Sequence, residues 1–253
     1  PERYLEHLQV PCEVFDVATA PPPLDLSKRQ LILAGHRGLS LPGDWQTAVI
    51  NAVSGGTGFV NLDWDPAVGS QAHVRTIFQA SGSVAGSPGS AISIPAAVRP
   101  GGATPHFITA LQVVFLGDTV DFAGNLIHNF HPDEQGLGHS VTPTVLQGAA
   151  GTVLATVGGD PLVLATGFGG GRAVHFGTLE YLKADRFGFL MGVDDLFWRA
   201  LVWAARKPFV LRGYPRLWAL QMDDTQPGWG SRVRDLFDPA LTGPVAPDGT
   251  GGP

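Results

Sequence analysis

Two adjacent carboxylates, Asp223 and Asp224, follow directly on the apolar run Leu217–Met222. Neighbouring residues at the end of an extended strand point in opposite directions, so one carboxylate could bind a divalent metal while the other acts as a base. A metal-dependent hydrolase needs both roles, because the base must deprotonate the water that the metal activates. From spacing alone we favour a solvated acidic turn, and the hydrolase role is the alternative.

The stretch Gly35–Ser40, GHRGLS, offers a different chemistry, because a histidine and an arginine follow an apolar run. His36 and Arg37 could contact an anion or a carbohydrate hydroxyl, and open α/β sheets place their ligands at the carboxyl ends of parallel strands. The alternative is a turn whose glycines permit a sharp exit from the strand while His36 bonds to backbone. We favour the turn, since no second catalytic residue type accompanies the pair.

A third candidate is the stretch Asn61–Pro66, NLDWDP, which also follows an apolar run. Asp63 and Asp65 flank Trp64, a combination suited to a sugar that stacks on the indole and bonds to the acids. Two acids at this spacing are also typical of turns in which each carboxylate bonds to backbone two residues ahead. Both interpretations stay open.

Histidines and acids are dense in the stretch 128–139, HNFHPDEQGLGH, which is suggestive of metal binding. His128 and His131 are three residues apart, but Pro132 prevents a helix from presenting them as the pair of a zinc hydrolase. We favour a solvated polar loop. The sequence contains no P-loop, no dinucleotide-binding fingerprint and no G-x-S-x-G nucleophile elbow.

The elements that would position His36 and Asp63 form a β-α-β unit. Continuous apolar runs at Gln30–Gly35 and in the stretch 58–66 predict two buried strands. A helix between them is predicted with Asp44 as its N-cap. Its apolar face comprises Trp45, Ala48, Val49, Ala52 and Val53. Short connections make the two strands parallel neighbours.

Further elements are predicted on either side of this unit. A short helix at Arg3–Leu8 and a strand at Cys12–Val17 precede it. In the stretch 148–180, the turn sequences GGDP and GFGGGR separate three apolar strands, which predicts consecutive hairpins. A last helix is predicted at Val193–Lys207. Its apolar stripe comprises Leu196, Phe197, Ala200, Leu201 and Ala204. The predicted fold is α/β, a doubly wound, mainly parallel sheet flanked by helices, with an antiparallel hairpin edge.

Composition narrows the classes of partner. The net charge is −6 over 253 residues, which argues against nucleic acid as a partner, since no basic stripe is available to neutralise phosphates. No window approaches the roughly 18 apolar residues of a membrane span. Cys12 is the single cysteine, so no internal disulfide can form. The chain begins at Pro1 without an initiator Met, and we expect it to be a fragment of a longer protein.

Three stretches resemble the class I glutamine-amidotransferase-like domains, in particular the trehalose-utilisation type. They are LILAGHRGLS (31–40), TPHFITAL (104–111) and PLVLATGFGGGRAVHFGTLEY (161–181). The resemblance covers residues 1–211. Glutaminase members of this family carry a nucleophilic cysteine at an elbow, and the corresponding region near NLDWD has none. The resemblance therefore implies a scaffold that binds or packs and does not catalyse.

The stretch 199–228 resembles the junction that leads into polysaccharide-deacetylase-like domains, with a helix ending in WAARKPFV and a strand ending in two aspartates. This resemblance makes Asp223 the base and Asp224 a metal ligand, with zinc as the expected divalent metal. It implies that residues 212–253 are the truncated start of a deacetylase-like domain. The His-x-x-x-His pair of that family is absent after Asp224, so we expect this fragment to hold no metal firmly and to be inactive.

The parent protein is accordingly expected to remove acetyl groups from a polysaccharide, outside the cell or at the cell envelope. One alternative is a carbohydrate-binding module that uses His36, Arg37, Asp63, Trp64 and Asp65, with the C-terminal stretch as a linker. Another is a stand-alone hydrolase centred on His36. The expected partners are a polysaccharide or other carbohydrate and the remaining domains of the parent chain.

Overall fold

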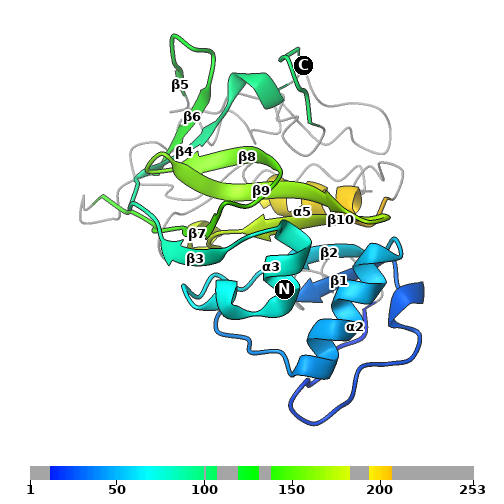
Figure 1. Cartoon of the computed structure of the whole chain (residues 1–253). Helices are drawn as coiled ribbons and strands as arrows, with labels where there is room; N and C mark the ends of the chain where they lie inside the picture. The colour runs from blue at the N-terminus through cyan, green and yellow to red at the C-terminus, as the bar shows by residue number, and fades with distance from the viewer. Residues whose placement is uncertain (1–11, 100, 107–118, 131–137, 183–193, 207–253) are drawn as a thin grey trace, which may run out of the picture. The chain divides into compact units, whose positions relative to one another are not determined.

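The computed structural model describes residues 12–99, 101–106, 119–130, 138–182 and 194–206 (Figure 1). The chain divides into two units, Pro1–Leu211 and Arg212–Pro253. All described residues belong to the first unit. The predicted helix at Arg3–Leu8 and the strand that ends at Asp223 lie outside them.

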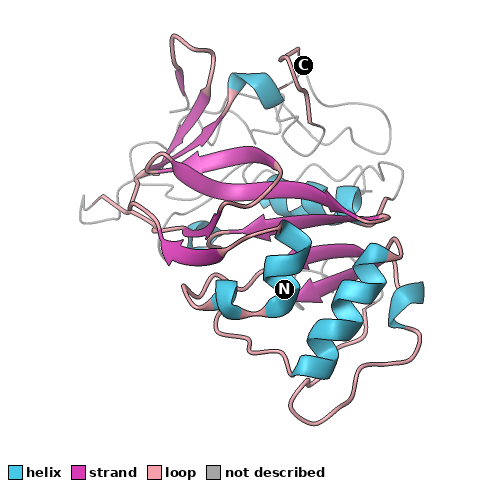
Figure 2. Ribbon diagram, in the orientation of Figure 1, coloured by secondary structure: helices cyan, strands magenta, loops and turns pink. Residues whose placement is uncertain are grey.

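The described residues form one sheet of eight strands and a second sheet of two (Figure 2). Across the large sheet the strands are β1 (Leu31–Ala34), β2 (Gly58–Asn61), β10 (Gly171–Phe176), β9 (Asp160–Phe168), β8 (Thr152–Val157), β4 (Ala91–Ile94), β6 (Leu126–Asn129) and β5 (Thr119–Val120). The small sheet pairs β3 (Gly82–Ala85) with β7 (Thr144–Gln147) in antiparallel orientation.

The α/β class is confirmed, but the large sheet is mixed and not mainly parallel. Of its seven described pairings, β1–β2 and β2–β10 are parallel and the others are antiparallel. The predicted hairpins of β8, β9 and β10 exist, yet they occupy the middle of the sheet because β10 pairs with β2. Residues 162–166 of β9 are all buried, as expected for a strand covered on both faces. Turn sequences predicted the hairpins correctly but carried no information on their place in the sheet.

Helices cover both faces of the parallel part of the sheet (Figure 1). They are α2 (Gly43–Ser54), α3 (Ala72–Phe78) and α5 (Asp194–Ala204), with short 3-10 turns η1 (Leu26–Lys28), η2 (Val68–Ser70), η3 (Ala96–Val98) and η5 (Glu180–Leu182). In β2, Phe59 belongs to the apolar core under α2 and α3, whereas Val60 belongs to the core under α5. This alternation follows from the two-residue period of a strand and explains why all of β2 is buried.

The two predicted amphipathic helices are confirmed. In α2, Trp45, Val49, Ala52 and Val53 are buried, and Ala48 packs against them. In α5, the predicted stripe is buried in full: Leu196, Phe197, Ala200, Leu201 and Ala204.

The predicted N-cap of α2 is wrong by two positions. The N-cap residue is Pro42, and Asp44 lies inside the first turn, where its Oδ1 accepts a hydrogen bond from the Trp45 N–H at 2.9 Å. An acidic residue within the first turn still interacts favourably with the positive end of the helix dipole, so the same residue type suits either position.

The predicted strand at Cys12–Val17 is also wrong. Residues 12–16 are irregular and a turn follows, with the Asp16 Oδ1 accepting a hydrogen bond from the Ala18 N–H at 3.0 Å. Val14 is 66% exposed, and its side chain does not pack on a sheet.

The helices among the described residues include none with the length and apolar composition of a membrane span.

Candidate functional site

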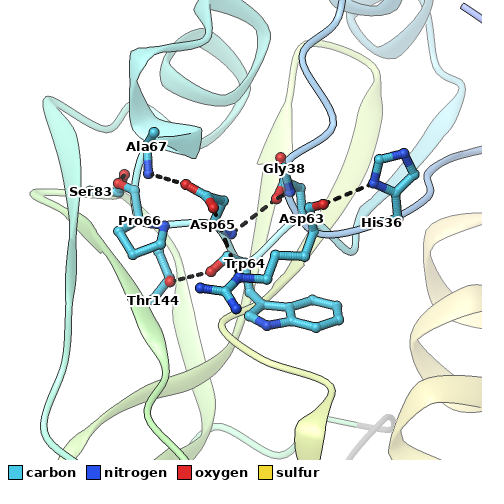
Figure 3. A network of polar contacts seen from close by, with 10 residues as sticks. His36, Gly38, Asp63, Trp64, Asp65, Pro66, Ala67, Ser83 and Thr144 are labelled. Carbon is cyan, nitrogen blue, oxygen red and sulfur yellow. Dashed lines mark hydrogen bonds and ion pairs between the residues drawn. The ribbon is translucent and has the colours of Figure 1, made fainter.

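The loops that follow β1 and β2 meet at one edge of the sheet. The two strands are parallel, with Ala34 opposite Asn61, so their carboxyl ends lie side by side. This placement brings the stretch 36–38 next to the stretch 63–65 (Figure 3). The structure therefore brings together the two stretches that the binding-module alternative combined.

Asp63 forms the bridge between the two loops. Its Oδ1 accepts one hydrogen bond from the Gly38 N–H at 2.7 Å and another from the Asp65 N–H at 3.0 Å. Gly38 has a φ of 74°, a left-handed conformation that favours glycine. Only 2% of the Asp63 residue surface is exposed, so this acid organises the backbone of the site from within.

The second carboxylate oxygen of Asp63 has an unusual environment. Oδ2 is buried and has no hydrogen-bond partner among the described residues. Burial raises the pKa of the Asp63 carboxyl, because removal from water disfavours the charged form. The backbone hydrogen bonds from Asp65 and Gly38 act in the opposite direction on this pKa, and so does the nearby His36.

Charged and polar groups line the exposed side of the same edge. The Arg37 Nε lies 3.8 Å from the Asp65 Oδ2, and the two side chains are 55% and 37% exposed. An ion pair at this separation and exposure contributes little, roughly 0–1 kcal/mol, so both groups can exchange it for ligand contacts. The exposed His36 donates its Nδ1–H to the Arg37 carbonyl at 2.9 Å, which leaves Nε2 as the acceptor of the neutral ring.

The turn interpretation of NLDWDP is confirmed in its geometry. The Asp63 Oδ1 bonds to the N–H of Asp65, and the Asp65 Oδ1 accepts a hydrogen bond from the Ala67 N–H at 2.9 Å. Two consecutive turns of this kind present Trp64 half-buried at the sheet edge. The Trp64 carbonyl accepts a hydrogen bond from the Thr144 hydroxyl of β7 at 2.5 Å, which holds the backbone of this loop.

Sequence reasoning missed two buried polar residues behind this loop. Asn61 ends β2 and His175 faces it from β10, with the Asn61 Nδ2 2.8 Å from the His175 Nδ1. Burial lowers the pKa of His175 to about 4. The available signal was a polar residue inside each of two otherwise apolar strands, GFVN and GRAVHF.

Another buried histidine lies on α3. His73 is 2% exposed, its ring meets the Phe59 ring edge-on with centroids 5.9 Å apart, and its Nδ1 has no hydrogen-bond partner among the described residues. Burial lowers its pKa to about 4. His73 and His175 are thus two neutral core histidines, of which only His175 bonds to the candidate site.

The histidine-rich stretch 128–139 divides differently from the prediction. His128 lies in β6 and is 5% exposed, so it is part of the sheet and not of a solvated loop. His131, Asp133 and Glu134 lie outside the described residues. Within the part of the chain that the structure describes, no three His, Cys, Asp or Glu side chains are grouped to hold a metal ion. The predicted base Asp223 and metal ligand Asp224 also lie outside that part.

Comparison with known proteins gives likenesses of structure only. No family model and no curated protein matches the sequence. A solved structure of a cytoplasmic protein from Salmonella typhimurium is 13% identical over 74% of this chain and 77% of its own, with a TM-score of 0.45. A protein from Parabacteroides merdae described as ThuA-like is 15% identical over 77% of this chain and 76% of its own, with a TM-score of 0.46. A β-galactosidase from Bacillus circulans matches with a TM-score of 0.31, 15% identity, 70% of this chain and 21% of its own. Likenesses of this size support no conclusion about activity.

Proposed function

We propose that the domain of residues 1–211 binds a carbohydrate at the edge where the β1 and β2 loops meet. The observation that carries this proposal is the 2.7 Å hydrogen bond from the Gly38 N–H to the Asp63 Oδ1, which joins the two loops. Arg37 and Asp65 consequently lie next to each other, beside a half-buried tryptophan.

The exposed groups suit a neutral, hydroxyl-rich ligand. The Trp64 indole offers a flat apolar surface for the C–H face of a sugar ring. The Arg37 guanidinium donates hydrogen bonds and the Asp65 carboxylate accepts them, so together they can bond to neighbouring hydroxyls. Their opposite charges largely cancel, which favours a neutral ligand over an anion.

Binding without catalysis is the role that these residues support. The turn after β2 reads Asn61-Leu62-Asp63-Trp64-Asp65 and supplies neither a cysteine nor a serine nucleophile. The histidine of the neighbouring loop, His36, bonds through its Nδ1 to the Arg37 carbonyl, and among the described residues its Nε2 bonds to no hydroxyl or thiol that it could activate. We therefore assign the domain an accessory role, like that of a non-catalytic amidotransferase-like domain.

Replacement of Trp64 by alanine tests this role. We expect the affinity for a β-1,4-linked N-acetylglucosamine hexamer to fall at least roughly tenfold, because the stacking surface is lost. Isothermal titration calorimetry on the whole chain measures the affinity of the wild type and of Trp64→Ala, with a glucose hexamer as the second ligand. Phe122→Ala is the matched control, since Phe122 is fully exposed on the turn between β5 and β6. Equal affinities of the wild type and Trp64→Ala would count against the site.

The C-terminal assignment is a separate proposal, supported by the sequence LQMDDTQPG (220–228). In it, residues 212–253 begin a metal-dependent deacetylase domain of a carbohydrate-active parent at the cell envelope or outside the cell. Asp223 would be its base and Asp224 a ligand of its zinc.

Because the sequence provides no histidine after Asp224, we expect this chain alone to release no acetate from acetylated polysaccharide when zinc is added. An acetate-release assay checks this expectation. Zinc-dependent turnover that disappears in Asp223→Asn would overturn it.

A further inference from the structure

Two buried polar side chains connect the middle of the sheet to the candidate site. Asn61 of β2 and His175 of β10 are partners in the parallel register and are 0% and 3% exposed. Such groups are costly to bury unless they are hydrogen-bonded, and apolar residues would serve the packing of these strands better. Core packing therefore does not explain why these two residues are polar, and we infer that they have another role.

The hydrogen bonds of this pair determine the orientation of both side chains. The Asn61 Nδ2 lies 3.1 Å from the Asp63 carbonyl, which can only accept, so this atom is the amide donor. Nδ2 also lies 2.8 Å from the His175 Nδ1, which must accept and therefore carries no proton. The proton is then on Nε2, which donates to the Thr144 carbonyl at 3.3 Å. The two backbone carbonyls thus require the same tautomer of a neutral His175.

The same hydrogen bonds connect residues of three strands, β2, β10 and β7, to the loop of residues 63–65. Asn61 contacts Asp63 at both ends of that residue, because its Oδ1 also lies 3.4 Å from the Asp63 N–H. Thr144 of β7 accepts from His175 through its carbonyl and donates to the Trp64 carbonyl through its hydroxyl. Asp63 in turn holds Gly38 (Figure 3).

We propose that Asn61 and His175 are positioning residues for the Asp63–Asp65 loop, an inference that rests on the proposed carbohydrate site at this loop. They contact no ligand themselves. His175 fixes the orientation of the Asn61 amide, and Asn61 fixes the backbone of Asp63. The carboxylate of Asp63 then holds the backbone of Gly38. This bond keeps the neighbouring Arg37 within reach of Asp65.

Nuclear magnetic resonance on the whole chain tests this inference without a ligand. In the wild type at pH 7, the long-range ¹H–¹⁵N spectrum should show His175 protonated at Nε2 and unprotonated at Nδ1. The amide protons of Gly38 and Asp65 should resonate far downfield, because both bond to a carboxylate oxygen. A His175 ring protonated at Nδ1 would overturn the inference from the wild type alone.

Variants separate positioning from mere stability. In His175→Phe, which fills the space without an acceptor, we expect the Gly38 and Asp65 signals to move upfield and the affinity for the N-acetylglucosamine hexamer to fall roughly tenfold. His175→Asn keeps an acceptor near the Nδ1 position and should retain both signals. The matched control is His73→Phe, which removes the other buried histidine and should leave both signals and the affinity unchanged.

The outcomes distinguish the two proposals. Unchanged Gly38 and Asp65 signals in His175→Phe, or equal changes in His73→Phe, would overturn the positioning role. If the signals move as expected but the wild type binds neither sugar hexamer, the proposed function fails while the positioning of the loop by Asn61 and His175 stands.

Discussion

Gly58→Ala is expected to destabilise the domain by about 3 kcal/mol or more, although it adds a single methyl group. A Cβ at this position would lie 2.3 Å from the Ala204 carbonyl oxygen and 2.5 Å from its carbon. Both are backbone atoms of the last turn of α5, which cannot rotate away as a side chain can. The first residue of β2 must therefore be glycine for α5 to pack against this strand.

Urea denaturation of the whole chain, followed by circular dichroism, measures this effect. The matched control is Gly43→Ala at the first position of α2, where a Cβ meets no atom within 4 Å. The control should be neutral or stabilise by a few tenths of a kcal/mol, because alanine is the better helix former. Equal stabilities of the two variants would show that α5 does not approach β2 in the way described.

Acid should destabilise the domain between pH 6.5 and about pH 4, through two buried histidines. The pKa values of His73 and His175 are lowered from 6.5 to about 4 by burial. In this range the unfolded chain binds protons that the folded chain does not, so the free energy of unfolding falls as the pH falls. Each lowered pKa corresponds to about 3 kcal/mol once the pH reaches the folded value.

The sign of this effect is specific to groups that are buried neutral. The contribution of these histidines to the free energy of unfolding is complete above pH 6.5 and is lost as the pH falls. A histidine paired with a carboxylate has a raised pKa and shows the reverse dependence. Asp63 acts the other way, because its raised pKa lets the folded chain bind a proton more firmly between 3.8 and that raised value. Its contribution is thus favourable at low pH and is lost as the pH rises.

Unfolding free energies from urea titrations at pH 7, 6, 5 and 4.5 check the expectation. The slope of the unfolding free energy against pH should become smaller in His73→Phe, because this variant removes one of the two buried histidines and leaves the hydrogen bonds of His175 and Asp63 in place. An identical pH dependence in the wild type and in His73→Phe would contradict the neutral, buried state of His73.

Local patterns in the sequence predicted the local structure well. The apolar faces of α2 and α5 follow from residues spaced by one helical turn, and the turn sequences between β8, β9 and β10 predicted their hairpins. The order of strands was not predictable in this way. Whether β10 pairs with β2 or ends the sheet depends on contacts between segments that are more than one hundred residues apart in the chain. The failed strand at Cys12–Val17 has the same origin, since an apolar run becomes a strand only where a partner strand accepts it.

The candidate site was predictable in part, for a physical reason. His36, Arg37, Asp63, Trp64 and Asp65 lie near the ends of two apolar runs, and the β-α-β pattern implied that these ends are neighbours. The burial of Asp63 could not be predicted from the sequence, because a carboxylate in a polar loop is normally exposed to water. Asn61 and His175 were missed because a single polar residue in a strand gives no indication of its partner across the sheet.

The central claim, that a carbohydrate binds where the β1 and β2 loops meet, is tested most directly by mapping ligand-induced shifts in the ¹H–¹⁵N spectrum of the whole chain. The ligand is the β-1,4-linked N-acetylglucosamine hexamer, with the glucose hexamer in a parallel titration. We predict saturable shifts concentrated at residues 36–38 and 63–65 and at the Trp64 indole N–H, for at least one of the two sugars. Saturable shifts confined to other parts of the chain, or no shifts with either sugar, would contradict the claim.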